Sequence, residues 1–120
     1  MKSLVRSGVG EVAESDRLAA RLGVPMSEIA AFCDRWGVAE LALFGSVLRD
    51  DFGPDSDVDV LVQFKAGRTP GLFVAARIRR ELAEMCRRPV DLVHRPTIER
   101  SQNYIRRKRI LGSARVVYAA

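Results

Sequence analysis

The chain has 120 residues, of which 48% are hydrophobic and 29% charged, enough for one domain with its own core and too few for two of ordinary size. No apolar run is long enough to cross a bilayer and residues 1–17 lack a signal-peptide pattern, which excludes a membrane-spanning protein and favours the cytoplasm. The net charge of +5 suits polyanions or an acidic partner, but it does not by itself establish nucleic-acid binding, which we do not favour.

The N-terminal part of the chain predicts two helices. Residues 11–24 fit a short helix that ends at Gly23. A second helix is expected from Ser27, a good N-cap residue, to Gly37, which supplies a stop. Apolar residues repeat at helical spacing along its inner face: Ile29, Phe32, Cys33 and Trp36.

Two strands are expected next, and we expect them to pair. Residues 38–45 form an apolar run that enters a Gly-Ser turn, and residues 58–64 form a second run after a Gly-Pro-Asp turn. Residues 65–71 are rich in Gly and Pro and predict a loop.

The remaining third predicts two helices, each followed by a short strand. The helices are expected at residues 72–88 and 97–111, the second capped by Thr97, and the strands at residues 90–94 and 114–119. The inward positions of the two helices are expected to be Leu72, Ala75, Ile78, Leu82 and Met85 in the first and Ile98 and Ile105 in the second.

Carboxylates interrupt the strand at residues 58–64, where aspartate is unfavourable. Because side chains alternate along a strand, Asp57 and Asp59 should project from one face and the neighbouring valines from the other. Their Cα atoms would be roughly 7 Å apart, which lets both carboxylates reach divalent cations about 4 Å from each other, as in two-metal phosphoryl-transfer sites. Asp91, at the start of a later apolar strand, is the candidate third acid.

The Gly45-Ser46 turn is the candidate phosphate site. Glycine allows a ligand to approach the backbone, and Ser46 is expected to cap a short helix whose free N–H groups would face an anion. Arg49 is expected either to bind phosphate or to hold the loop through a carboxylate such as Asp55.

These motifs resemble the minimal nucleotidyltransferases (MNT) of the DNA polymerase beta superfamily, antitoxins often encoded beside HEPN-domain toxins. The matching residues are Gly45, Ser46, Arg49, the stretch Ser56-Asp57-Val58-Asp59, and Asp91. Asp50 departs from the family pattern, which usually has Gly there. The resemblance covers about residues 27–118, so residues 1–26 are expected to be an extension and residues 27–120 the nucleotidyltransferase domain.

The resemblance implies an α/β (α+β) fold, in which helices back a small mixed sheet, and Mg²⁺-dependent transfer of AMP from ATP to a hydroxyl group. It implies that Asp57 and Asp59 hold two Mg²⁺ ions and that Asp91 holds the catalytic one and helps to deprotonate the acceptor. Gly45, Ser46 and Arg49 would bind the nucleotide. The implied acceptor is a tyrosine of a HEPN ribonuclease toxin, held in a hetero-oligomer.

Other interpretations stay open. A calcium loop starting at Asp55 fails, because its sixth position would be Val60 instead of Gly and its twelfth Ala66 instead of Glu. The chain could instead be a transferase for a small molecule or an RNA end, or a non-catalytic subunit that masks a toxin. The basic stretch at residues 106–109 fits binding to a toxin, RNA or the triphosphate, and it fits equally well a solvent-exposed helix face that binds nothing.

Overall fold

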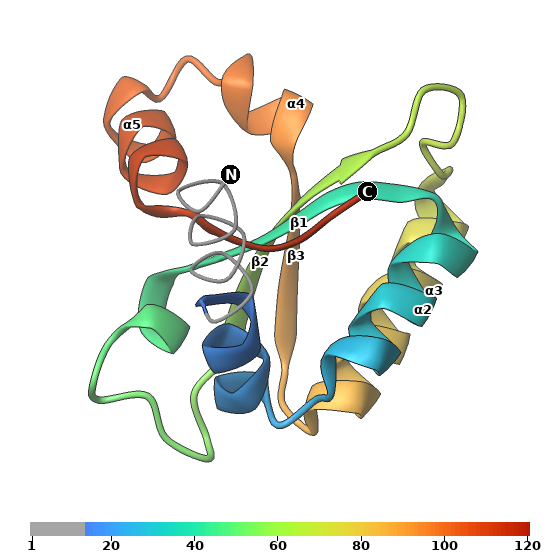
Figure 1. Cartoon of the computed structure of the whole chain (residues 1–120). Coiled ribbons are helices and arrows are strands. Elements are labelled where there is room, and N and C mark those ends of the chain that lie inside the picture. Colours follow the sequence, from blue (N-terminus) through green and yellow to red (C-terminus); the bar gives the residue numbers. More distant parts are fainter. Residues whose placement is uncertain (1–13) are drawn as a thin grey trace, which may run out of the picture.

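The computed structural model describes residues 14–120, in which four strands form one mixed sheet of order β3-β2-β1-β4 (Figure 1). The strands are β1 (Val38–Phe44), β2 (Val58–Phe64), β3 (Val90–His94) and β4 (Arg115–Ala119). β1 pairs antiparallel with both β2 and β4, whereas β2 and β3 run parallel. The predicted mixed sheet and its four strands are therefore confirmed.

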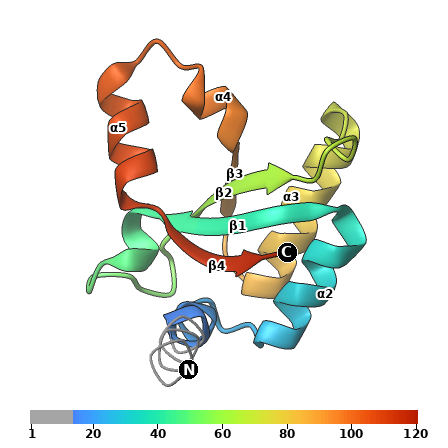
Figure 2. The same ribbon diagram turned by 45° about the horizontal axis from the view of Figure 1, so that its top comes forward.

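Helices cover both faces of this sheet. They are a helix at residues 14–22, α2 (Met26–Trp36), the 3₁₀ turn η1 (Gly45–Leu48), α3 (Leu72–Cys86), α4 (Arg95–Glu99) and α5 (Tyr104–Ser113). Figure 2 shows α2 and α3 on one side of the sheet and α4 and α5 on the other. Within residues 14–120, no helix has the length and apolar character needed to span a membrane.

Strand alternation produces two separate hydrophobic clusters. Leu41 and Leu43 of β1 belong to the large cluster under α2 and α3, together with the β2 valines Val58, Val60 and Val62. The small cluster under α4 and α5 contains Ala42, Phe44, Leu61, Ile98 and Ile110. Asp59 lies directly opposite Phe44 in the antiparallel ladder, so it shares the face of the small cluster. The predicted separation of this aspartate from the valines is confirmed.

The helix at residues 14–22 is part of the large cluster. It ends at Gly23 as predicted, with φ of +73°, and the start predicted at residue 11 lies outside the described residues. Its buried contributions, together with the turn that follows, are Leu18, Ala19, Leu22 and Val24, all between 3% and 6% exposed. The domain boundary after residue 26 stays a prediction.

Two predicted helix details are wrong. α2 starts at Met26 with Pro25 at the N-cap position, two residues before the expected Ser27 cap, because proline has no N–H to satisfy and its fixed φ suits a helix start. Its end at Gly37, which has φ of +71°, is as predicted. Leu72 is 85% exposed and does not join the inner stripe, because it is the first residue of α3 and the buried positions begin only at Ile78.

The single helix predicted at residues 97–111 is also wrong, because α4 and α5 are separate helices. The Ser101 hydroxyl accepts a hydrogen bond from the Asn103 N–H (3.2 Å), and the Asn103 side chain accepts one from the Arg106 N–H (3.1 Å). Such local side-chain bonds compete with a continuous helix. Thr97 therefore lies inside α4 instead of capping a helix. Ile98 is buried as expected, whereas Ile105 is 69% exposed.

Asn103 is the N-cap of α5 and gives a direct test of this break. Replacing Asn103 with Ala should lower the free energy of unfolding by about 1 kcal/mol, since the Arg106 N–H loses its acceptor. Chemical denaturation measures the change, with Gln102→Ala, an exposed neighbour, as the matched control. Equal stability of the two variants would contradict the capping role.

Candidate active site

The turn after β1 places Gly45 against the acidic strand. Gly45 has φ of +76°, a backbone conformation that favours glycine. A Cβ atom added there would lie 2.3 Å from Oδ2 of Asp59, well inside contact distance. The absence of a side chain at this position therefore lets the η1 turn and the Asp59 carboxylate lie together.

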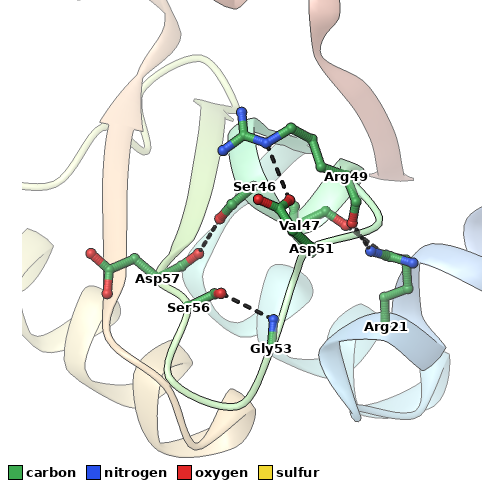
Figure 3. A network of polar contacts seen from close by, with 8 residues as sticks. All are labelled: Arg21, Ser46, Val47, Arg49, Asp51, Gly53, Ser56 and Asp57. Atoms are coloured by element: carbon green, nitrogen blue, oxygen red, sulfur yellow. Dashed lines mark hydrogen bonds and ion pairs between the residues drawn. The ribbon is translucent and has the colours of Figure 1, made fainter.

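Ser46 ties the same turn to the start of β2. Its hydroxyl donates a hydrogen bond to the backbone carbonyl of Asp57 (3.0 Å), as Figure 3 shows. The expectation that Ser46 caps a short helix is wrong: the N-cap of η1 is Phe44, and Ser46 lies inside the turn with its hydroxyl occupied by Asp57. Ser46 thus fixes the distance between the turn and the acids.

The three predicted acids lie at the N-terminal ends of the parallel strands β2 and β3. Asp59 and Asp91 are directly opposite each other in the parallel ladder, so both face the side of the sheet covered by α4 and α5. Asp57 is the residue before β2, is exposed, and directs its carboxylate away from the η1 turn (Figure 3). The structure thus brings Asp59 and Asp91 together and places Asp57 beside them with a different side-chain direction.

The charges of these acids act on one another. Burial raises the pKa of Asp59, and the negative charges of Asp91 and Asp57 raise it further, while the positive charge of Arg49 lowers it in part. A carboxylate that is disfavoured in its ionised form is suited to accept a cation, because the cation removes the repulsion.

Oxygen donors of this kind fit Mg²⁺, which is held through one or two carboxylates plus substrate phosphates. Within residues 14–120, however, no three Asp, Glu, His or Cys side chains form a group ready to hold a metal. The acids therefore supply suitable ligands without forming a closed cage.

The loop after η1 is held by its own side chains. Arg49 forms an ion pair with Asp51 (Nε to Oδ1, 3.5 Å). The loop carboxylate that it was expected to bind, Asp55, is therefore wrong. The Ser56 hydroxyl accepts a hydrogen bond from the Gly53 N–H (3.0 Å; Figure 3). Asp50 is exposed.

An open cavity of about 680 Å³ lies between the η1 turn and α5. Its charged walls are Asp59, Arg49, Arg106 and Arg109, and its apolar walls include Phe44, Leu48, Ile105 and Ile110. Arg106 and Arg109 are spaced i, i+3 on α5 and therefore face the same side of the helix. The predicted nucleotide-binding residues Gly45 and Arg49 line this cavity, whereas Ser46, Asp57 and Asp91 are not among its lining residues.

His94, the one histidine of the sequence, lies away from the acids. It lies opposite Val62 in the ladder and its ring is 5.8 Å from that of Phe64, so it faces the large cluster, away from Asp59. Burial, followed by the nearby charge of Arg100, lowers its pKa.

A glycine turn, strand carboxylates and an arginine-lined cavity together form the kind of site that carries out phosphoryl transfer by positioning and electrostatics. The chain belongs to the nucleotidyltransferase domain family, whose model matches residues 28–116. It is 35% identical over 66 residues to the protein adenylyltransferase MntA of Thermococcus cleftensis, a match that spans 55% of this chain and 65% of that protein.

Solved structures agree with this family. A structure described as a minimal nucleotidyltransferase is 31% identical and has a TM-score of 0.59, covering 84% of this chain and 93% of its own. A toxin–antitoxin structure with AMP-PNP has a TM-score of 0.60 at 16% identity, covering 79% of this chain and 73% of its own. The complex of a tri-AMPylated Shewanella oneidensis HEPN toxin with MNT antitoxin has a TM-score of 0.53 at 18% identity, covering 79% and 70%. The last two show the fold alone.

Proposed function

We propose that this chain is an antitoxin adenylyltransferase, which transfers AMP from ATP to a tyrosine hydroxyl of a HEPN ribonuclease partner. The observation that carries the proposal is the cavity in which Arg49, Arg106 and Arg109 face Asp59 beside the Gly45 turn. A triphosphate needs several positive charges, and its reacting phosphate needs carboxylates that can hold cations nearby.

In this mechanism the arginines bind the phosphates. Arg106 and Arg109 on one wall and Arg49 on the other neutralise the triphosphate, while the apolar walls accept the nucleoside. Gly45 lets the phosphates approach the backbone.

The acids complete the site. Asp57, Asp59 and Asp91 would hold two Mg²⁺ ions, which supply charge neutralisation at the reacting phosphate and leaving group. Asp91, exposed at the strand edge, takes the proton of the acceptor hydroxyl as the bond from oxygen to the α-phosphate forms and the bond to pyrophosphate breaks.

The relatives support this choice of substrate and partner. The curated relative is named an adenylyltransferase, one fold neighbour carries an ATP analogue, and another is bound to an AMPylated HEPN toxin. An acceptor contributed by a partner protein also fits a cavity that is open to solvent on one side.

Intact mass spectrometry tests the proposal. The purified chain is incubated with ATP, Mg²⁺ and a purified HEPN-domain protein as the candidate partner, and the mass of that partner is measured. A gain of one or more AMP masses that is absent with Asp57→Asn supports the transferase. A stable complex without a mass gain indicates a masking subunit, and AMP on a small molecule or RNA end indicates a different acceptor.

The arginines of α5 give a second prediction. Arg106→Ala and Arg109→Ala should each weaken ATP binding by about tenfold, since each removes a charge-assisted hydrogen bond to phosphate worth roughly 1.5 kcal/mol. Titration calorimetry measures the affinity, and Lys108→Ala, on the same helix but outside the cavity lining, is the control. Equal affinities for all three variants would place the triphosphate elsewhere.

A further inference from the structure

Arg21 binds the turn that carries the nucleotide site. Its Nε donates to the backbone carbonyl of Val47 (2.6 Å), and its Nη2 donates to the backbone carbonyl of Arg49, 28 residues away along the chain. Figure 3 shows the guanidinium reaching this turn from a separate helix. One planar side chain therefore satisfies two backbone acceptors at the end of η1.

The backbone around Arg21 is held by the hydrophobic core. Its neighbours Leu18, Ala19 and Leu22 on the helix at residues 14–22 are between 3% and 6% exposed and pack in the large cluster. This helix precedes residues 28–116, the part that matches the family model. A contact to the turn thus comes from a segment that precedes the residues matched by the family model.

A second contact holds the loop that follows the turn. The guanidinium carbon of Arg21 lies 5.6 Å from the centre of the Phe52 ring, and that of Arg88 lies 4.2 Å from it. Arg88 also donates to the backbone carbonyl of Gly53. The backbone between Val47 and Gly53 is therefore held by two arginines that are far apart in the sequence, Arg21 and Arg88.

We propose that Arg21 is a positioning residue, which holds the turn at residues 47–49 in the form that binds the nucleotide; this rests on the proposed function. Arg49 is the residue affected, because its backbone carbonyl is bound by Arg21 while its side chain lines the cavity. Without Arg21, the backbone of Arg49 is no longer held in place. The Arg49 guanidinium is then not fixed at the cavity wall where it would contact the triphosphate.

The test uses Arg21→Ala and Arg21→Lys in the full chain, with Arg17→Ala, an exposed position on the same helix, as the control. We expect Arg21→Ala to raise the KM for ATP by about tenfold to a hundredfold with a smaller change in kcat. Lysine keeps the charge but lacks the planar fork, so it should restore only part of the affinity. Arg17→Ala should behave as the parent.

Amide hydrogen exchange separates positioning from general stability. Faster exchange at residues 47–52 in a folded Arg21→Ala or Arg21→Lys protein, with the sheet amides unchanged, supports the proposal. Unchanged exchange at these residues, or a uniform increase across the sheet, overturns it. The parent protein shows whether the proposed function itself fails. If the parent neither binds ATP nor transfers AMP, but exchange at residues 47–52 still depends on Arg21, then Arg21 holds the turn without a role in nucleotide binding.

Discussion

Replacing Asp59 with Asn is expected to abolish AMP transfer and to raise the thermal stability of the metal-free protein. Transfer should fall by about a thousandfold or more, because in the proposed mechanism Asp59 would hold a metal ion that contributes several kcal/mol of charge stabilisation at the reacting phosphate. Asp57→Asn should have the same effect on transfer. Rates are measured by release of pyrophosphate and by mass gain of the acceptor, and unchanged transfer in both variants would refute the metal-site assignment.

The stability gain from Asp59→Asn should depend on pH. Burial and the charges of Asp91 and Asp57 raise the pKa of Asp59 above its ordinary value of 3.8, so the folded state binds this proton more tightly than the unfolded state. The parent protein therefore loses stability as the pH rises from 3.8 through the raised pKa, and Asn removes that loss. The melting temperature of the variant should exceed that of the parent at neutral pH, and the difference should disappear below pH 3.8.

Asp34→Asn is the control for this experiment, because Asp34 is an exposed carboxylate on α2, across the sheet from the acids. Its melting temperature should equal that of the parent at neutral pH. An Asp59→Asn gain that persists unchanged below pH 3.8 would show that the effect does not come from the charge.

Gly45→Ala is expected to have the second large effect. Alanine at φ of +76° costs about 1–2 kcal/mol of folding free energy, and its Cβ would lie 2.3 Å from Oδ2 of Asp59. The carboxylate must move to relieve this contact, so transfer should fall by about a hundredfold even in the protein that remains folded.

Gly67→Ala separates the two causes, because Gly67 has the same φ of +76° but an added Cβ there meets nothing within 4 Å. We expect this control to keep parent activity. Denaturation and transfer assays on both variants are the measurements, and equal activities would show that the η1 turn tolerates a side chain beside Asp59.

The strands could be predicted from the sequence because their patterns are local. The apolar runs at β1 and β2 and the alternation around Asp59 need no knowledge of the rest of the fold. The break between α4 and α5 could not be predicted from periodicity, since it depends on side-chain bonds made by Ser101 and Asn103 to nearby backbone. The early start of α2 was missed because Ser27 is the stronger cap on general preference, although Pro25 occupies the position.

The sequence indicated single residues of the site, including the distant Asp91, but not the packing between elements that brings them together. Gly45 and Asp59 carry sequence signals, but the alignment of Asp59 with Asp91 depends on a parallel register that is set by the whole sheet. Arg106 and Arg109 stood out as basic residues, and only the packing of α5 over the small cluster brings them to the cavity. No pattern in the sequence indicated the contact of Arg21 with residues 47 and 49.

The strand order has a consequence for synthesis on the ribosome. β1 lies between β2 and β4, and β4 is the last strand along the chain. Until residues 115–119 have emerged, β1 has one unpaired edge, and α5, which leads directly into β4, is attached to the domain only through its N-terminal side. A nascent chain that has already formed β1, β2 and β3 should therefore hold the acids before the cavity wall that carries Arg106 and Arg109 is fixed, so under the proposed function nucleotide binding should begin only after β4 is translated.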